Sequence, residues 1–304
     1  MKRTVISSLV FALLISFATG VAAEDGSSAE SQQETKEAKT QKKKRPRMDV
    51  VFAIDATGSM GDEIDVIKKE VWNIANELMT GKPAPDIRFG LVLYRDKSDS
   101  QLIEATPLTR NVDEIHEKLM AARAMGGGDN PEHVGKGLHT ALDMEWDTAK
   151  GVAKKIYLVG DAPAKSYQDN TLETAISKAQ QKGIKINAIG GSGIEAGGGK
   201  AQFAMIAKRA GGNFEALTYF AVVEEPDGSK KSVVYHEGKT YEAEGEISED
   251  EWKKGAEEVV KKRKMKAASE STRRKARSAD KKNNLDSVVE QDMKTEAMDM
   301  GVAY

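Results

Sequence analysis

Apolar residues along the middle of the chain alternate between short continuous runs and longer stretches with helical spacing. Residues 50–54 form a continuous apolar run, which is typical of a strand buried on both faces of a sheet. Residues 64–78 follow with apolar side chains three and four positions apart, and Gly81 and Pro83 end this predicted helix. The alternation continues and predicts strands at 87–94, 101–106, 155–159, 184–189 and 213–217, and helices at 112–125, 131–147, 171–182 and 201–210.

Strands that alternate with helices over this length predict an α/β fold. We expect a doubly wound, Rossmann-like domain at residues 48–222, in which helices cover both faces of a mostly parallel sheet. The strand at 101–106 is expected to be antiparallel to its neighbour. The alternation then stops, and short strands are predicted at 221–225, 232–235 and 240–243, followed by a charged helix at 251–266. We assign residues 223–304 to a small C-terminal extension that ends in a disordered tail.

The N-terminal residues lack this pattern. A positively charged start and a mostly apolar run precede the small residues Val21-Ala22-Ala23, so residues 1–23 are predicted to be a secretory signal peptide. An uncleaved membrane anchor is the alternative, because the apolar run approaches the length that spans a bilayer. Residues 24–47 are too polar to bury a core and predict a disordered linker. We therefore expect an exported protein of the periplasm, cell envelope or medium, with no transmembrane segment after cleavage.

Composition narrows the classes of function. The chain of 304 residues carries a formal net charge of −2 and no Cys, which excludes a disulfide framework and argues against a general affinity for nucleic acid. The exception is a basic segment that starts at Lys253 and ends at Lys282, with 13 Lys or Arg against four acids. We interpret it as a solvated helix with a flexible tail, and contact with an anionic surface is the alternative.

Candidate chemistry stands where two predicted strands end. Asp55 closes the first strand, Thr57 and Ser59 follow it at alternate positions, and Asp161 follows the strand at 155–159. Ligands of open α/β sheets bind at the carboxyl ends of the strands. Two acids and two hydroxyls converging there make an oxygen-only set, which suits a hard cation such as Mg²⁺. A plain turn, in which the hydroxyls bond their own backbone, is the alternative.

The order Asp-x-Thr-x-Ser after an apolar strand resembles the signature of von Willebrand factor type A domains. Those domains bind a divalent cation at a metal-ion-dependent adhesion site, and the similarity extends over residues 48–217. The resemblance implies that Asp55, Thr57 and Ser59 supply the first loop of metal contacts and Asp161 the last. It also implies Mg²⁺ as the cation, with Mn²⁺ or Ca²⁺ as alternatives.

The middle loop, residues 126–132, reads Gly-Gly-Gly-Asp-Asn-Pro-Glu and lacks the Thr that many members of this family have. Its Asp-x-Pro-Glu order resembles the integrin beta-chain version of the site. That resemblance implies Glu132 as a further metal ligand, with Asp129 as the second choice. Asp62 and Glu63 match the acids that hold an adjacent cation in the same version.

These observations predict a binding module and not an enzyme. A cation held on one side by the protein offers an open position to an Asp or Glu carboxylate of a partner protein, as in adhesion or envelope assembly. The alternative is a metal-assisted hydrolase that uses the same cation as a Lewis acid. Such an enzyme needs a general base, and the four His residues show no spacing that would supply one.

Overall fold

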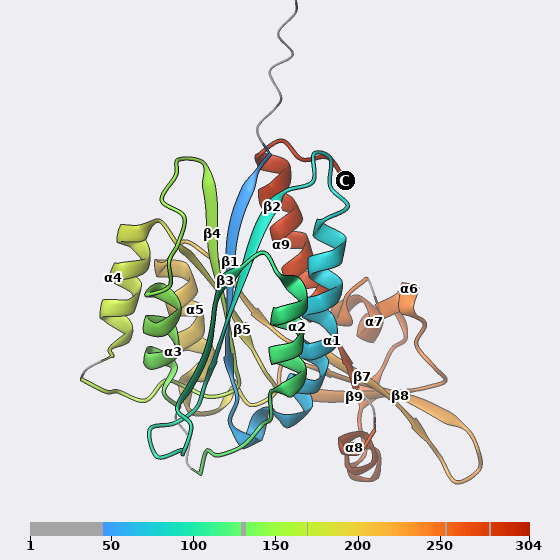
Figure 1. Ribbon diagram of the computed structural model, residues 1–304. Helices are drawn as coiled ribbons and strands as arrows, with labels where there is room; N and C mark the ends of the chain where they lie inside the picture. The colour runs from blue at the N-terminus through green and yellow to red at the C-terminus, as the bar shows by residue number, and fades with distance from the viewer. Residues whose placement is uncertain (1–44, 129–131, 169, 253, 280) are drawn as a thin grey trace, which may run out of the picture. The chain divides into compact units, whose positions relative to one another are not determined.

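The computed structural model describes residues 45–304 except 129–131, 169, 253 and 280, and except the side chains of residues 62, 66, 70 and 249 (Figure 1). The predicted signal peptide and residues 24–44 of the predicted linker lie outside the described residues. In the described part, no helix combines the length and the apolar character that crossing a bilayer requires.

The centre of the fold is a sheet of six described strands in the order β3-β2-β1-β4-β5-β6. Only β3 runs antiparallel to its neighbour among these strands, so the predicted α/β class with a mostly parallel sheet is confirmed. The strands are β1 (Arg47–Asp55), β2 (Asp86–Tyr94), β3 (Ile103–Thr109), β4 (Val152–Gly160), β5 (Lys185–Gly190) and β6 (Phe214–Ala216).

Helices cover both faces of this sheet (Figure 1). Alternate side chains of β1 point to opposite faces, so Val50 and Phe52 enter one hydrophobic cluster and Val51 and Ala53 another. The first cluster lies under α1 (Gly61–Leu78), α2 (Val112–Ala121) and α9 (Leu285–Asp299). The second lies under α3 (Val134–Leu142), α4 (Leu172–Lys182) and α5 (Gly199–Arg209).

A second sheet follows, with five described strands in the antiparallel order β10-β9-β8-β7-β11. The helix predicted at 251–266 is instead two short helices, because Gly255 between them has a left-handed φ of 94°. The elements are β7 (Tyr219–Glu224), β8 (Lys230–His236), β9 (Lys239–Glu244), α6 (Glu249–Trp252), α7 (Ala256–Lys262), β10 (Lys266–Ala267), α8 (Glu270–Arg277) and β11 (Lys281–Asn283).

The tail, predicted to be disordered, contains helix α9, which packs beside α1 on the first sheet. Val289, Met293 and Ala297 are spaced four residues apart and are fully buried in the first cluster. Asp292 of α9 accepts hydrogen bonds from Tyr157 (2.5 Å) and Lys155 (2.7 Å) on β4. The prediction was wrong because the apolar positions are sparse, while the polar side chains between them find partners on the sheet.

Candidate metal site

The first and last predicted site segments meet at the carboxyl edge of the central sheet. β1 and β4 are parallel neighbours, with Ile54 beside Val159, and the chain continues into Asp55 from one strand and into Asp161 from the other. Asp55 is fully buried and Asp161 is 6% exposed. Because parallel neighbours end at the same edge of a sheet, these two acids lie together although they are 106 residues apart in sequence.

Hydrogen bonds join the first loop to Asp161. Oδ1 of Asp55 accepts from the backbone N–H of Thr57 (2.9 Å) and from its hydroxyl (2.7 Å). The Thr57 hydroxyl lies 3.3 Å from Oγ of Ser59, which in turn donates to Oδ1 of Asp161 (3.2 Å). Four of the predicted ligands thus form one continuous chain of oxygen atoms.

Glu132 enters the same region from the loop that precedes α3. Its backbone N–H donates to Pro163 O (2.9 Å) and its carbonyl accepts from Lys165 N (2.7 Å), which fastens it beside the segment that follows β4. A Cβ at Gly127 would lie 3.4 Å from Oε1 of Glu132 and 3.2 Å from Cβ of Thr57, so the absence of a side chain at Gly127 keeps this space open. The competing candidate, Asp129, lies outside the described residues.

The carboxylates of this cluster are poorly compensated. Oδ2 of Asp55 and Oε2 of Glu132 are buried and have no hydrogen-bond partner among the described residues. Burial raises the pKa of Asp55 to about 7 against the hydrogen bonds from Thr57, and repulsion from Asp161 adds to the rise. Burial and then repulsion from Asp55 raise the pKa of Glu132 to about 8, and burial also raises the pKa of Asp161.

This donor set fits a hard divalent cation. Buried carboxylate oxygens without a protein donor are costly unless a cation or proton neutralises them. Among the described residues, no cluster of three or more His, Cys, Asp or Glu side chains has the spacing of a metal site. A cation at this edge would therefore rely on the hydroxyls of Thr57 and Ser59 as well as on carboxylates, which is compatible with Mg²⁺ and its retained waters.

The two acids predicted to hold an adjacent cation lie in the first turn of α1. Asp62 is placed only by its backbone. Glu63 is 2% exposed, and its Oε1 accepts hydrogen bonds from Ser192 N (3.2 Å), Ser192 Oγ (2.6 Å) and Tyr219 OH (3.2 Å). A cation at Glu63 would have to compete with these three protein donors.

Sequence reasoning missed two residues that shape the site loops. Arg95 is 1% exposed, and its guanidinium donates to the carbonyls of Ala56 (3.1 Å), Gln101 (3.1 Å) and Arg123 (3.1 Å). Asp99 accepts from the backbone N–H of Gly127 through both carboxylate oxygens (3.0 and 3.1 Å). Arg95 follows β2 directly, so it could have been identified by examining the residue that follows this predicted strand, as was done for Asp55 and Asp161.

Comparison with known proteins shows the family to which the chain belongs. The family described as von Willebrand factor A domain matches the chain over residues 49–217, which is more than half of its length. The chain belongs to this family. The matched region of this von Willebrand factor A domain starts at β1 and includes the loops that carry Asp55, Glu132 and Asp161.

Two proteins of known name are similar in sequence to parts of this chain. The alpha-protein kinase vwkA of Dictyostelium discoideum is 26% identical over 141 residues, which cover 46% of this chain and 22% of the kinase. The von Willebrand factor A domain-containing protein 7 of Rattus norvegicus is 33% identical over 97 residues, 32% of this chain and 10% of the rat protein. The matches therefore span about a fifth or less of the length of these two proteins.

Solved structures resemble the chain at lower identity. The pilus adhesin SpaC from Lactobacillus rhamnosus GG superimposes with a TM-score of 0.44 at 12% identity, over 66% of this chain and 37% of the adhesin. BatB from Bacteroides thetaiotaomicron has a TM-score of 0.43 at 16% identity, over 56% of this chain and 89% of BatB.

Proposed function

We propose that this von Willebrand factor A domain is a divalent-cation-dependent module that binds another protein, in adhesion or in assembly of the cell envelope. The cation is Mg²⁺, with Mn²⁺ or Ca²⁺ as alternatives. It would be held by the donors at the carboxyl edge of the sheet: Asp55, Thr57, Ser59, Glu132 and Asp161. The observation that supports the proposal is a pair of buried oxygens, Oδ2 of Asp55 and Oε2 of Glu132, for which the described part of the chain supplies no hydrogen-bond partner.

The chemistry of this donor set favours holding a ligand over transforming one. Carboxylate and hydroxyl oxygens satisfy only part of the coordination of a hard cation, and the remaining positions hold water. A carboxylate of a partner protein, from Asp or Glu, can replace that water and bind the cation directly. Together with the predicted signal peptide at residues 1–23, this supports a role outside the cytoplasm, with an envelope or secreted protein as the partner.

Cation binding by the full chain tests the site. After treatment with a chelating resin, the protein should bind Mg²⁺ and Mn²⁺ in isothermal titration calorimetry. Asp55→Ala should weaken binding by at least about a hundredfold, since losing even an outer partner of a metal ligand costs about 10–100-fold. Asp65→Ala removes an exposed carboxylate on the same side of the sheet and should leave the affinity unchanged. Equal affinities for these two variants, or no binding by the wild type, would refute the site.

The middle loop needs its own pair of variants. Glu132→Gln and Asp129→Asn each remove one charge and keep the shape of the side chain. We expect Glu132→Gln to weaken Mg²⁺ binding more, because Glu132 reaches the cluster that contains Asp55. The reverse order would assign the ligand to Asp129.

Partner recognition is tested by capture from an envelope extract with immobilised wild-type chain and Asp55→Ala. A partner that binds through the cation should be captured by the wild type in Mg²⁺ and lost either when the metal is removed or when Asp55 is replaced. Because both changes remove the same contact, their effects should not add. A partner retained in the absence of metal would contradict the proposal.

A further inference from the structure

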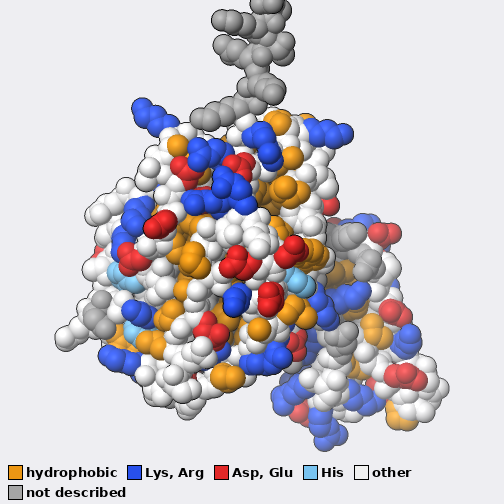
Figure 2. Space-filling model, viewed as in Figure 1, with side chains coloured by type: hydrophobic (Ala, Val, Ile, Leu, Met, Phe, Trp, Pro, Cys, Tyr) orange, Lys and Arg blue, Asp and Glu red, His pale blue; other side chains and the backbone are white. Residues whose placement is uncertain are grey.

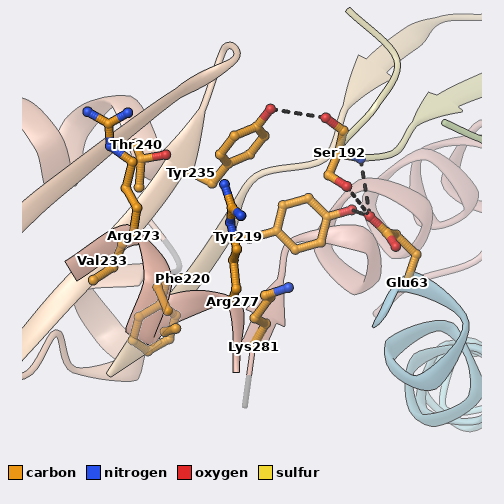
Figure 3. A pocket seen from close by; sticks show the side chains of 12 residues that line it. Glu63, Ser192, Tyr219, Phe220, Val233, Tyr235, Thr240, Arg273, Arg277 and Lys281 are labelled. Atoms are coloured by element: carbon orange, nitrogen blue, oxygen red, sulfur yellow. Dashed lines mark hydrogen bonds between the residues drawn. The ribbon is translucent and has the colours of Figure 1, made fainter. Parts of the chain in front are cut away.

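A cavity of about 430 Å³ lies between the second sheet, helix α8 and the residue pair Glu63 and Ser192 (Figure 3). This volume lies within the range of about 300–1,000 Å³ that is common for small-molecule sites. Three separate parts of the chain build its walls: the strands of the second sheet, α8 with the start of β11, and a third part made of Glu63 in the first turn of α1 and Ser192 in the loop after β5.

Basic side chains form one wall. Arg273 and Arg277 lie on α8 and Lys281 begins β11, so the three follow each other at four-residue intervals. Residues four apart share one face of a helix, which turns both guanidinium groups toward the cavity. Figure 2 shows Lys and Arg side chains gathered over α8. These residues belong to the basic segment 253–282, for which contact with an anionic surface is the alternative prediction.

The two Arg side chains that α8 contributes to this wall make few contacts with the rest of the protein. Within the described residues, Arg277 is exposed and makes no hydrogen bond or ion pair. Arg273 donates one hydrogen bond from Nε to Ala268 O (2.9 Å), and its Nη1 lies 3.9 Å from Glu270, at the limit of an ion pair. By contrast, Lys275 of the same helix does not line the cavity and pairs with Glu225 at 2.5 Å. Arg273 and Arg277 of α8 therefore present positive charge to the cavity.

The opposite wall is aromatic and apolar. Tyr219, Phe220, Val233 and Tyr235 contribute to it. Its polar groups already have partners, since Tyr235 OH donates to Ser192 O (3.0 Å) and Tyr219 OH donates to Glu63 Oε1 (3.2 Å). The inner end of the cavity is thus held together by its own hydrogen bonds (Figure 3).

We propose that this cavity binds a small organic anion, in which a carboxylate or phosphate group is joined to an aromatic or other apolar body. Among the described residues that line the cavity, three are basic and one is an acid, Glu63, which accepts hydrogen bonds from the protein. The chain as a whole carries a net charge of only −2, so this positive wall is a local feature. The planar donor fork of Arg matches carboxylate and phosphate oxygens, and the rings opposite would pack against the body of the ligand.

The proposal is tested by calorimetry with three probes of similar size: phenyl phosphate, phenylacetate and the neutral benzyl alcohol. The full chain is first freed of metal on a chelating resin, because a soluble chelator is itself a polyanion. We expect one or both anions to bind, and benzyl alcohol to bind at least about tenfold more weakly. Loss of a charge-assisted hydrogen bond in Arg277→Gln should weaken anion binding about 10–100-fold.

Arg274→Gln is the matched control, since Arg274 is an exposed residue of the same helix that does not line the cavity. It should change the affinity by less than about twofold. Asp55→Ala should also keep the affinity for the anion, which separates this cavity from the candidate metal site. A failure to bind cations would therefore refute the metal site without refuting the cavity proposal. A failure to bind anions would refute the cavity proposal without refuting the metal site.

The ranking of phenyl phosphate against phenylacetate assigns the anionic group of the natural ligand. Three results would overturn the proposal: no heat with either anion at about 10 mM, equal loss of affinity in Arg277→Gln and Arg274→Gln, or anion binding that requires Mg²⁺. The last result would place the anion on the cation instead of in the cavity. Circular dichroism of both Arg variants checks that exposed substitutions on α8 leave the fold intact.

Discussion

Helix α9 should be an integral part of the domain, and Met293→Ala is the sharpest test. The Met293 side chain is fully buried in the cluster formed by α1, α9 and the central sheet. The substitution deletes three heavy atoms, which costs about 2–3 kcal/mol in transfer free energy at ~0.8 kcal/mol per buried group. The cavity that remains adds to this, so we expect a loss of about 3–4 kcal/mol in the free energy of unfolding, inside the usual 2–5 kcal/mol for Met→Ala.

Met298→Ala makes the same chemical change on the same helix, where the side chain is 58% exposed. It should alter the free energy of unfolding by less than about 0.5 kcal/mol. Urea unfolding of the full chain, followed by circular dichroism, measures both variants. A lower midpoint for Met293→Ala with an unchanged slope would report lost stability alone. Equal midpoints for the two variants would show that α9 does not pack on the sheet, and would refute the argument from burial.

Two further predictions concern Arg95 and the anchoring of α9. Arg95→Lys keeps the charge but replaces the planar fork of donors, which reaches three separate loop carbonyls, by one compact ammonium group, so Mg²⁺ affinity should fall about tenfold. The exposed Arg110→Lys should leave the affinity unchanged. Equal calorimetric affinities for the two variants would exclude a positioning role for Arg95. Burial of Glu296 opposes its ionisation, but its bonds to Lys185 and Lys155 outweigh this and lower its pKa below 4.5. The contribution of ionised Glu296 to the free energy of unfolding is therefore complete above about pH 4.5. It is lost as the pH falls through the lower pKa that Glu296 has in the folded state. Urea unfolding at pH 5 and at pH 3 measures how much free energy of unfolding is lost on acidification. This loss should be smaller in Glu296→Gln than in the wild type, and an equal loss would contradict the prediction.

The sequence predicts the central sheet well because its strands are continuous apolar runs that few other structures would bury. It also predicts where Asp55 and Asp161 meet, since parallel strands end at one edge of a sheet. It does not predict α9, whose polar residues are compatible with solvent until Lys155 and Tyr157 of β4 are placed opposite them.

The partners of Glu63 illustrate the same limit. The resemblance to the integrin beta-chain version of the site predicts Glu63 as a ligand of an adjacent cation. In the structure its carboxylate accepts bonds from Ser192 and from Tyr219, residues that are far from it in sequence. The local sequence pattern identifies an acid near the site. The hydrogen-bond donors to its carboxylate, however, are determined by tertiary packing between the two sheets.

The return of α9 to the central sheet makes the second sheet an insertion and not an appendage. The chain leaves the host fold after β6, builds β7–β11 with α6–α8, and re-enters through α9. The inserted second sheet is connected to the first sheet by the chain at both of its ends. It therefore has less freedom to rotate than a terminal domain, which is connected by a single linker. Truncation after β6 would also strip the host of one of its covering helices. Because α9 follows the second sheet in the chain, a fragment that keeps α9 also keeps this sheet, and with it both the proposed anion cavity and the candidate metal site.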